Sequence, residues 1–204
     1  MEIKRVVSQY LDSNVFVLAK NNQVVIVDAG VEAEKIAKVV AGKKVLGVLL
    51  THGHYDHSLF AGEYAEKFDC KVYCSNEALH TLADGEENYS EGQFIVTDFS
   101  RFVVCEDSEK IILGDFEIEF LQTKGHSRCS ASFLIEKQLF SGDTLFAQGI
   151  GRTDLVGSNK YEMLSSLERL EKVDFEYAYS GHGESSTKEE QQKNIAIFKR
   201  FLKR

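Results

Sequence analysis

Short runs rich in Val, Ile and Phe alternate with polar residues and turn residues along the first part of the chain. This pattern predicts strands at 3–7, 14–19 and 23–28. Asn21-Asn22 is suited to a tight turn between the last two, so we expect an antiparallel meander. Apolar residues of 31–40 share one helical face and predict a helix that leads to a buried strand at 45–50.

Strands and helices alternate along the rest of the chain. Further strands are predicted at 71–74, 111–113, 116–121, 132–135, 138–140 and 176–179. Further helices are predicted at 60–68, 75–82, 160–170 and 187–202, the second of them capped by Ser75. The order predicts an α/β protein in which two sheets pack together with helices outside, as one domain over 1–204.

Periodicity fails between Ala83 and Asp98, where the chain is polar and contains glycine. We interpret this segment as an exposed loop that could cover a site.

Composition excludes several classes of protein. A net charge of -8 argues against nucleic-acid binding as the main function, because such domains usually carry a basic face. No stretch has the length of a transmembrane helix, and residues 1–10 lack the apolar core of a signal peptide, so we expect a cytoplasmic protein without a membrane partner. The four cysteines include no CxxC pair and are expected to be free thiols.

The chain contains no proline, whereas average usage predicts roughly ten. Chance is a poor explanation for this absence. Either the source has an unusual compositional bias, or prolines were replaced deliberately in an engineered variant.

The most informative segment is the string from Thr51 to His57, THGHYDH, which follows the buried strand. It holds three imidazoles and a carboxylate at a strand's C-terminal end, where open α/β sheets tend to bind ligands. Three more candidates, His126, Asp143 and His182, each stand beside glycine. Nitrogen and oxygen donors suit borderline transition metals, and seven donors predict two metal ions. An accidental polar loop is the alternative, but it does not explain the downstream partners.

The pattern HxHxDH, followed by separate His, Asp and His, resembles the metallo-β-lactamase superfamily. Within it, the strings GDTLF at 142–146, GRTDL at 151–155 and GHG at 181–183 resemble the glyoxalase II-like branch of thioester hydrolases. The resemblance covers nearly the whole chain. It implies a four-layer αββα sandwich with a dinuclear centre in a cleft at the edge of the sheets.

The resemblance also implies a role for each donor. The first metal would be held by His52, His54 and His126. The second would be held by Asp56, His57 and His182, with Asp143 bridging the two. The cofactors would be two divalent ions of zinc, iron or manganese, and a hydroxide shared by them would attack a thioester such as S-lactoylglutathione. Asp56 would both bind metal and orient that hydroxide, so the expected partner is a small thiol conjugate.

Two further residues have competing interpretations. Asp28 ends a strand and is either a turn former or a hydrogen-bond partner of the metal loop. Arg152 is suited to binding a substrate carboxylate, and the alternative is an ion pair with Asp154.

Four other polar residues are interpreted more simply. Lys124 and Arg128 flank His126 and could attract an anionic thiol carrier, although loop cations are usually only solvated. Cys129 is expected to be a small buried thiol rather than a ligand. His80 stands alone on a predicted helix and is expected at the surface.

The chain also departs from the family pattern. Longer glyoxalase II enzymes carry a C-terminal helical domain that holds much of glutathione, whereas only residues 183–204 follow His182 here. Family members also commonly have proline at positions 29, 124, 156 and 184.

Other functions remain open. One is persulfide dioxygenase, which would use a single iron at His52, His126 and Asp143. A lactonase or a β-lactamase of the same superfamily is less favoured because the GRTD string points elsewhere. A non-enzymatic metal-binding protein is the remaining class, and seven donors argue against it because a purely structural metal is usually closed by four ligands. Metal stoichiometry distinguishes the first two functions.

Overall fold

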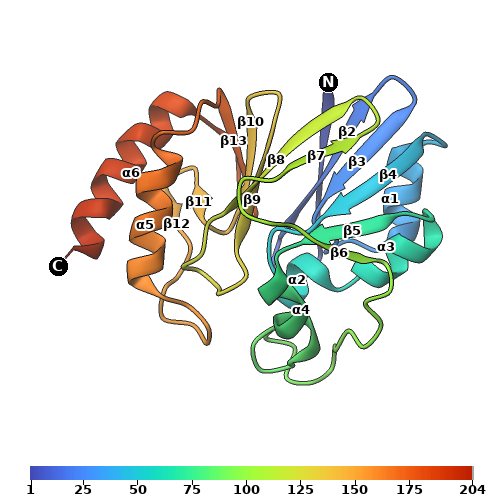
Figure 1. The fold of residues 1–204 in the computed structure, drawn as a ribbon, viewed down its shortest axis with the longest axis horizontal. Coiled ribbons are helices and arrows are strands. Elements are labelled where there is room, and N and C mark those ends of the chain that lie inside the picture. The colour runs from blue at the N-terminus through green and yellow to red at the C-terminus, as the bar shows by residue number, and fades with distance from the viewer. Residues whose placement is uncertain (204) are drawn as a thin grey trace.

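A computed structural model describes residues 1–203 of the chain. Two six-stranded sheets lie face to face, and helices cover the outer side of each (Figure 1). The arrangement confirms the predicted four-layer αββα sandwich.

The first sheet is formed by the N-terminal half of the chain. Its strands, in order across the sheet, are β1 (Glu2–Val7), β2 (Asn14–Lys20), β3 (Gln23–Val27), β4 (Lys44–Leu49), β5 (Lys71–Cys74) and β6 (Phe102–Val104). β1 to β3 are antiparallel, as predicted, and β3 to β6 are parallel. Parallel neighbours require crossover connections, which contain α1 (Ala33–Val40), α2 (Tyr55–Ser58), α3 (Ala61–Lys67) and α4 (Asn76–Ala83).

The second sheet is formed by the C-terminal half. Its strands, in order across the sheet, are β14 (Ser186–Thr187), β13 (Tyr177–Ser180), β10 (Gln138–Gly142), β9 (Ala131–Ile135), β8 (Phe116–Gln122) and β7 (Lys110–Leu113). A small ribbon of β11 (Leu145–Phe146) and β12 (Gly149–Ile150) precedes α5 (Lys160–Leu170), and α6 (Lys188–Leu202) ends the fold.

Side chains that point alternately to the two faces of a strand contribute to two different hydrophobic cores. In β2, Val15 and Val17 join the core shared with α1 and α3, whereas Phe16 and Leu18 point between the sheets. Successive strand residues face opposite sides, so one apolar strand serves both layers. Residues 15–18 of β2 are therefore all apolar because both faces of the strand are buried.

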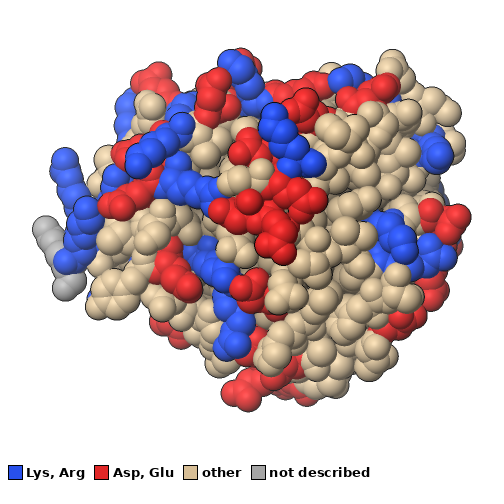
Figure 2. Space-filling model, viewed as in Figure 1, with Lys and Arg blue, Asp and Glu red and all other residues tan. Residues whose placement is uncertain are grey.

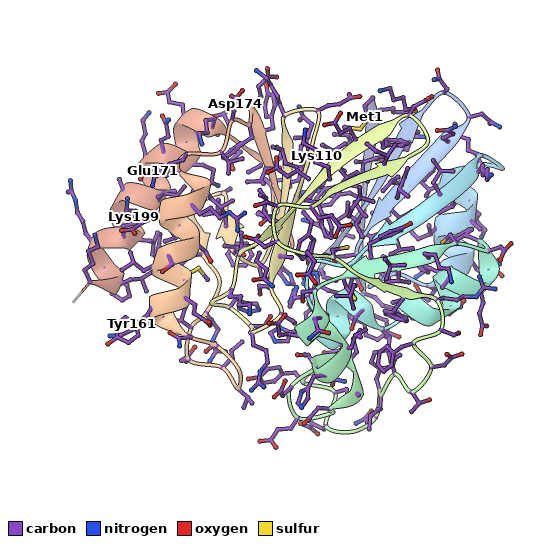
Figure 3. All side chains as sticks on the ribbon, in the orientation of Figure 1. Met1, Lys110, Tyr161, Glu171, Asp174 and Lys199 are labelled. Carbon is purple, nitrogen blue, oxygen red and sulfur yellow. The ribbon has the colours of Figure 1, made fainter. Side chains whose placement is uncertain are left out.

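The outer helices α5 and α6 pack on the second sheet through a third core that includes Met163, Leu167 and Ile195. Lys199 of α6 pairs with Glu171 at the end of α5, with 2.7 Å between Nζ and Oε2 (Figure 3). Basic and acidic side chains lie next to one another over this side of the molecule (Figure 2). Within residues 1–203, no helix combines the length and apolar character that crossing a bilayer requires.

Main-chain and side-chain hydrogen bonds join the two sheets at one edge. The Ala131 amide donates to the Thr51 carbonyl over 2.8 Å, and the Asn14 amide donates to the Gly181 carbonyl over 2.7 Å. The Asn14 side-chain amide also donates to the Ser180 carbonyl. The loop that follows β4 is thereby held against β9 of the second sheet, and the loop that follows β13 is held against β2 of the first.

Three expectations about local structure need correction. Short elements escaped prediction, namely β6, β11, β12, β14 and α2. Ser75 is the N-cap residue of α4, but its hydroxyl donates to the Cys129 carbonyl instead of capping the helix. The segment 83–98 lacks regular structure after Ala83, as expected, yet Glu87, Asn88 and Ser90 are buried, so it is not exposed throughout.

The core between the sheets generates a stability prediction. Phe133 is fully buried and meets Phe120 edge to face, with ring centroids 5.5 Å apart. Phe133→Ala should lower the free energy of unfolding by about 3–5 kcal/mol, because it leaves a cavity between two rigid sheets. Urea titration in excess chelator measures this without a contribution from metal. Phe201→Ala, at a side chain that is 67% exposed, is the control. Equal urea midpoints for Phe133→Ala and Phe201→Ala would contradict the placement of Phe133 in the core between the sheets.

Candidate metal centre

The first sheet delivers four of the predicted donors through the segment after β4. His52 and His54 lie on the connection from β4 to α2, and Asp56 and His57 lie within α2. Gly53 is needed in this segment, because a Cβ there would lie 2.8 Å from the Thr81 methyl group. The four side chains are buried.

The second sheet delivers the other three donors from three of its strands. His126 follows β8, Asp143 follows β10 and His182 follows β13. Glycine again permits the close approach, since a Cβ on Gly181 would lie 2.0 Å from Asp143 Oδ1. The structure therefore brings all seven predicted donors together at the edge where the sheets are joined.

The donor atoms fall into overlapping groups in which every atom lies within 4.8 Å of the others. These groups are His52 with His54 and His126, His52 with His57 and Asp143, and Asp56 with His57 and His182. The first and third groups are the two sets of ligands that the resemblance implies.

Several of these buried atoms have no partner within the described chain. His52 Nε2, His54 Nε2 and Asp143 Oδ1 are buried without a hydrogen bond. Leaving buried polar atoms unpaired is costly, so such atoms indicate a missing ligand. Imidazole nitrogen and carboxylate oxygen are donors that zinc, iron and manganese accept, and the residues therefore fit a transition-metal centre.

Burial and neighbouring charges set the protonation of the cluster. Burial lowers the pKa of His54 to about 3, which keeps its imidazole in the neutral form that binds metals. Burial also lowers the pKa of His182, but hydrogen bonds with Asp143 and Asp56 outweigh it and raise that pKa to about 9. Burial raises the pKa of Asp143, yet His57 and His182 bring it down to about 2. Metal binding would displace the imidazole protons.

Asp28 supports the cluster from outside, as the second of its two interpretations requires. Its Oδ2 lies 2.9 Å from His57 Nδ1, and its Oδ1 accepts from the Thr51 amide over 2.8 Å. A carboxylate at Nδ1 fixes the imidazole so that Nε2 faces the other donors. Asp28 adopts a φ of 62°, a left-handed conformation that Asp and Asn tolerate better than most residues.

Arg152 adopts the alternative arrangement in this structure. Its guanidinium makes two hydrogen bonds to Asp154, of 2.9 and 3.0 Å, and its side chain is 69% exposed. The Arg152 carbonyl, in contrast, lies 3.1 Å from His126 Nδ1 and helps to orient that ring. Binding of a substrate carboxylate by Arg152 stays a prediction.

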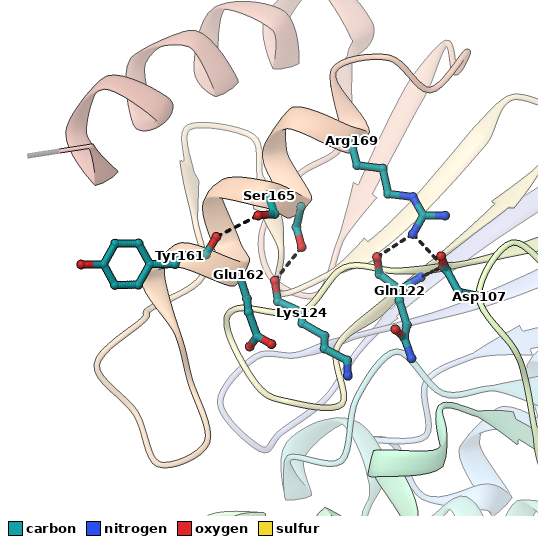
Figure 4. Close-up of a pocket in the computed structure, with 8 residues that line it drawn as sticks. Asp107, Gln122, Lys124, Tyr161, Glu162, Ser165 and Arg169 are labelled. Atoms are coloured by element: carbon teal, nitrogen blue, oxygen red, sulfur yellow. Dashed lines mark hydrogen bonds and ion pairs between the residues drawn. The ribbon is translucent and has the colours of Figure 1, made fainter.

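Lys124 and Arg128 are both paired with carboxylates. Lys124 Nζ lies 2.5 Å from Glu77, and Arg128 lies 2.9 Å from Glu87. Lys124 also lines a pocket of about 390 Å³ against α5, beside Arg169, which pairs with Asp107 (Figure 4).

Cys129 and His80 lie as the sequence predicted. The Cys129 thiol is buried and accepts from the Gly53 amide. The His80 side chain is 61% exposed.

Two contributors to the site were missed. The ring of Tyr89 meets the His54 ring edge to face, with centroids 5.1 Å apart. Ser13 donates from its hydroxyl to the Asp56 carbonyl over 2.6 Å. Tyr89 lies in a segment without periodicity and Ser13 in a polar turn, so neither gave a signal in a single sequence.

Comparison with known proteins agrees with this geometry. The family model described as the metallo-beta-lactamase superfamily matches residues 10–182. The chain belongs to this superfamily. A relative from Bacillus subtilis (strain 168), the probable metallo-hydrolase YqgX, is 34% identical over 194 residues, which cover 90% of this chain and 92% of the relative.

Solved structures of the superfamily superpose over almost the whole chain. BLEG-1, a B3 metallo-beta-lactamase, has a TM-score of 0.86 at 28% identity, with 97% of this chain and 99% of that chain covered. TTHA1623, crystallised in a di-iron-bound form, has a TM-score of 0.80 at 27% identity, with the same coverage of both chains. The resemblance inferred from the histidine motif is therefore confirmed at the level of the superfamily.

The position of Asp28 generates a prediction about metal affinity. Asp28→Asn keeps the volume and the backbone preference but puts an amide where a carboxylate faces Thr51 and His57. Metal affinity should fall about 10- to 100-fold, as is typical when a partner of a ligand is lost. Competition with a chromophoric chelator measures the affinity, and circular dichroism checks the fold. Asp174→Asn, at a side chain that is 84% exposed, is the control. Unchanged affinity in Asp28→Asn would show that His57 does not depend on this contact.

Proposed function

We propose that this protein is a metal-dependent hydrolase that uses two transition-metal ions to cleave a thioester such as S-lactoylglutathione. The observation that carries the proposal is the position of Asp143 between two groups of donors. Its Oδ2 lies 3.5 Å from His126 Nε2 and 3.4 Å from His182 Nε2. A carboxylate placed in this way is suited to bridging two cations.

The two groups of donors define which residues would hold each ion. The first ion would be held by His52, His54 and His126, and the second by Asp56, His57 and His182, with Asp143 between them. Zinc, iron and manganese all accept this mixed set of donors. When bound, such ions lower the pKa of water and polarise a carbonyl oxygen, which is the chemistry that hydrolysis at neutral pH needs.

Asp56 is the residue that we expect to orient the attacking water. Its Oδ2 lies 3.3 Å from both His57 Nε2 and His182 Nε2 and faces the middle of the cluster. Burial alone would raise the pKa of Asp56, but the charge on His57 outweighs it, and the pKa lies well below its usual value. The ionised carboxylate can accept a hydrogen bond from water and so direct an oxygen lone pair toward the substrate carbonyl.

The segment from Gly151 to Asp154 supports a thiol conjugate as the substrate. It carries the GRTD string of the glyoxalase II-like branch and lies against His126 through the Arg152 carbonyl. We propose that the Arg152 guanidinium exchanges Asp154 for a carboxylate of the thiol carrier. The name of the Bacillus subtilis relative, a probable metallo-hydrolase, supports the reaction class.

Metal analysis combined with a substrate panel tests the proposal. The loaded protein should contain two metal ions per chain and release thiol from S-lactoylglutathione. The panel also includes lactones and glutathione persulfide. One iron per chain with oxygen uptake on the persulfide would identify a dioxygenase, and preferential ring opening would identify a lactonase. Either result would overturn the proposed thioester hydrolase.

Asp143→Ala should lose activity and metal together. The substitution removes the shared carboxylate, so two cations would face each other without it, and we expect at least about a 100-fold loss of turnover. Metal content and thiol release are measured on the same preparations, with circular dichroism as a check of folding. His80→Ala is the control, because its exposed ring lies outside the centre. Normal turnover in Asp143→Ala would refute the bridging role.

A further inference from the structure

An aromatic pocket of about 490 Å³ lies beside the metal centre. Four aromatic residues and Leu59 line it together with three polar residues, and the aromatic ones are Tyr10, Tyr55, Tyr89 and Phe94 and the polar ones Ser90, Glu91 and Gln93. Small-molecule sites usually enclose roughly 300–1,000 Å³ and are lined mainly by apolar and aromatic groups. The pocket, which we call the tyrosine pocket, is therefore large enough to hold part of a substrate.

The tyrosine pocket adjoins the metal centre through residues that contact its donors. Tyr89 contacts the His54 ring edge to face, and Tyr55 stands between His54 and Asp56 in the chain. The Tyr10 carbonyl accepts from the amide of Ser13, which itself donates to the Asp56 carbonyl. A substrate whose carbonyl lies at the centre would therefore extend one substituent past Tyr89 to reach the pocket.

Tyr89 is held in an unfavourable backbone conformation. Its φ is 62°, which a bulky aromatic residue rarely adopts. Its hydroxyl accepts from the Val156 amide, and the neighbouring Asn88 carbonyl accepts from the Tyr55 amide over 2.8 Å. Strain that the surroundings enforce in this way is concentrated at functional sites. These contacts place the Tyr89 ring between the pocket and His54.

The charge of the pocket favours the acyl group of a thioester over an anionic thiol carrier. Its lining contains one charged residue, Glu91, which is acidic. The two cations that flank His126 in sequence are engaged elsewhere, since Arg128 pairs with Glu87 and Lys124 pairs with Glu77. An anionic thiol carrier would be repelled by Glu91, whereas a neutral ring can make edge-to-face contacts with the tyrosines.

We propose that the tyrosine pocket binds the acyl group of the substrate and selects a neutral aromatic acyl group over a small polar one. This inference rests on the proposed thioester hydrolase function and names the substrate class of the same centre. The thiol carrier would then lie outside the pocket, where Arg152 is proposed to bind its carboxylate.

Two thioesters of the same thiol test the selection. S-phenylacetylglutathione and S-lactoylglutathione differ only in the acyl group, and the metal-loaded protein should show a kcat/KM at least about tenfold higher for the first. Tyr10→Ala should lower this ratio about tenfold, and Tyr10→Phe should retain it. Tyr161→Ala, at a side chain of α5 that is 69% exposed, is the matched control. A preference for the lactoyl ester, or a ratio that Tyr10→Ala leaves unchanged, would overturn the proposal.

Binding of thioethers separates this inference from the proposed function. S-phenethylglutathione and S-(2-hydroxypropyl)glutathione match the two esters but lack the carbonyl, so they cannot be hydrolysed. Calorimetry should show at least about tenfold tighter binding of the phenethyl compound, weakened by Tyr10→Ala. If the phenethyl compound binds more tightly in this way but neither ester is hydrolysed, the proposed thioester hydrolase function is refuted and the binding role of the tyrosine pocket is supported. Equal binding of both thioethers would overturn the pocket's role.

Discussion

The joining of the two sheets at one edge is the constraint on which the rest of the structure depends. Four donors follow β4 of the first sheet and three follow strands of the second, so neither sheet holds a complete set. The hydrogen bonds from Ala131 to Thr51 and from Asn14 to Gly181 hold the loop after β4 to the second sheet and the loop after β13 to the first. A shift of one sheet against the other would separate His57 from His182, whose Nε2 atoms lie 3.2 Å apart.

Much of the architecture could be predicted because its physical causes are local. Strands such as β2 and β3 are apolar enough to be buried on both faces, and the capping box of Thr187 and Glu190 fixes the start of α6. The donors could be identified from the sequence because four of them are closely spaced directly after a predicted buried strand. The short elements β6 and β14 escaped because two or three residues carry no period, and their pairing depends on neighbours distant in sequence.

The parts of the site that could not be predicted share another property. Tyr89 and Ser13 act through contacts with residues more than thirty positions away, and the carbonyl of the buried Asn88 likewise accepts from the amide of Tyr55. Ser75 was expected to cap its own helix, but its hydroxyl donates instead to the carbonyl of Cys129, which is distant in sequence. Tertiary contacts override local preference where the chain encloses the centre.

The contact between His57 and His182 joins residues that lie 125 positions apart in the chain. An ion held by both would act as a reversible crosslink between the two halves of the sandwich, closing a loop that the unfolded chain keeps open. The free energy of unfolding would then rise with the concentration of free metal, through linkage between binding and folding. Metal supply would thus govern how much of the chain is folded as well as how much of it is active.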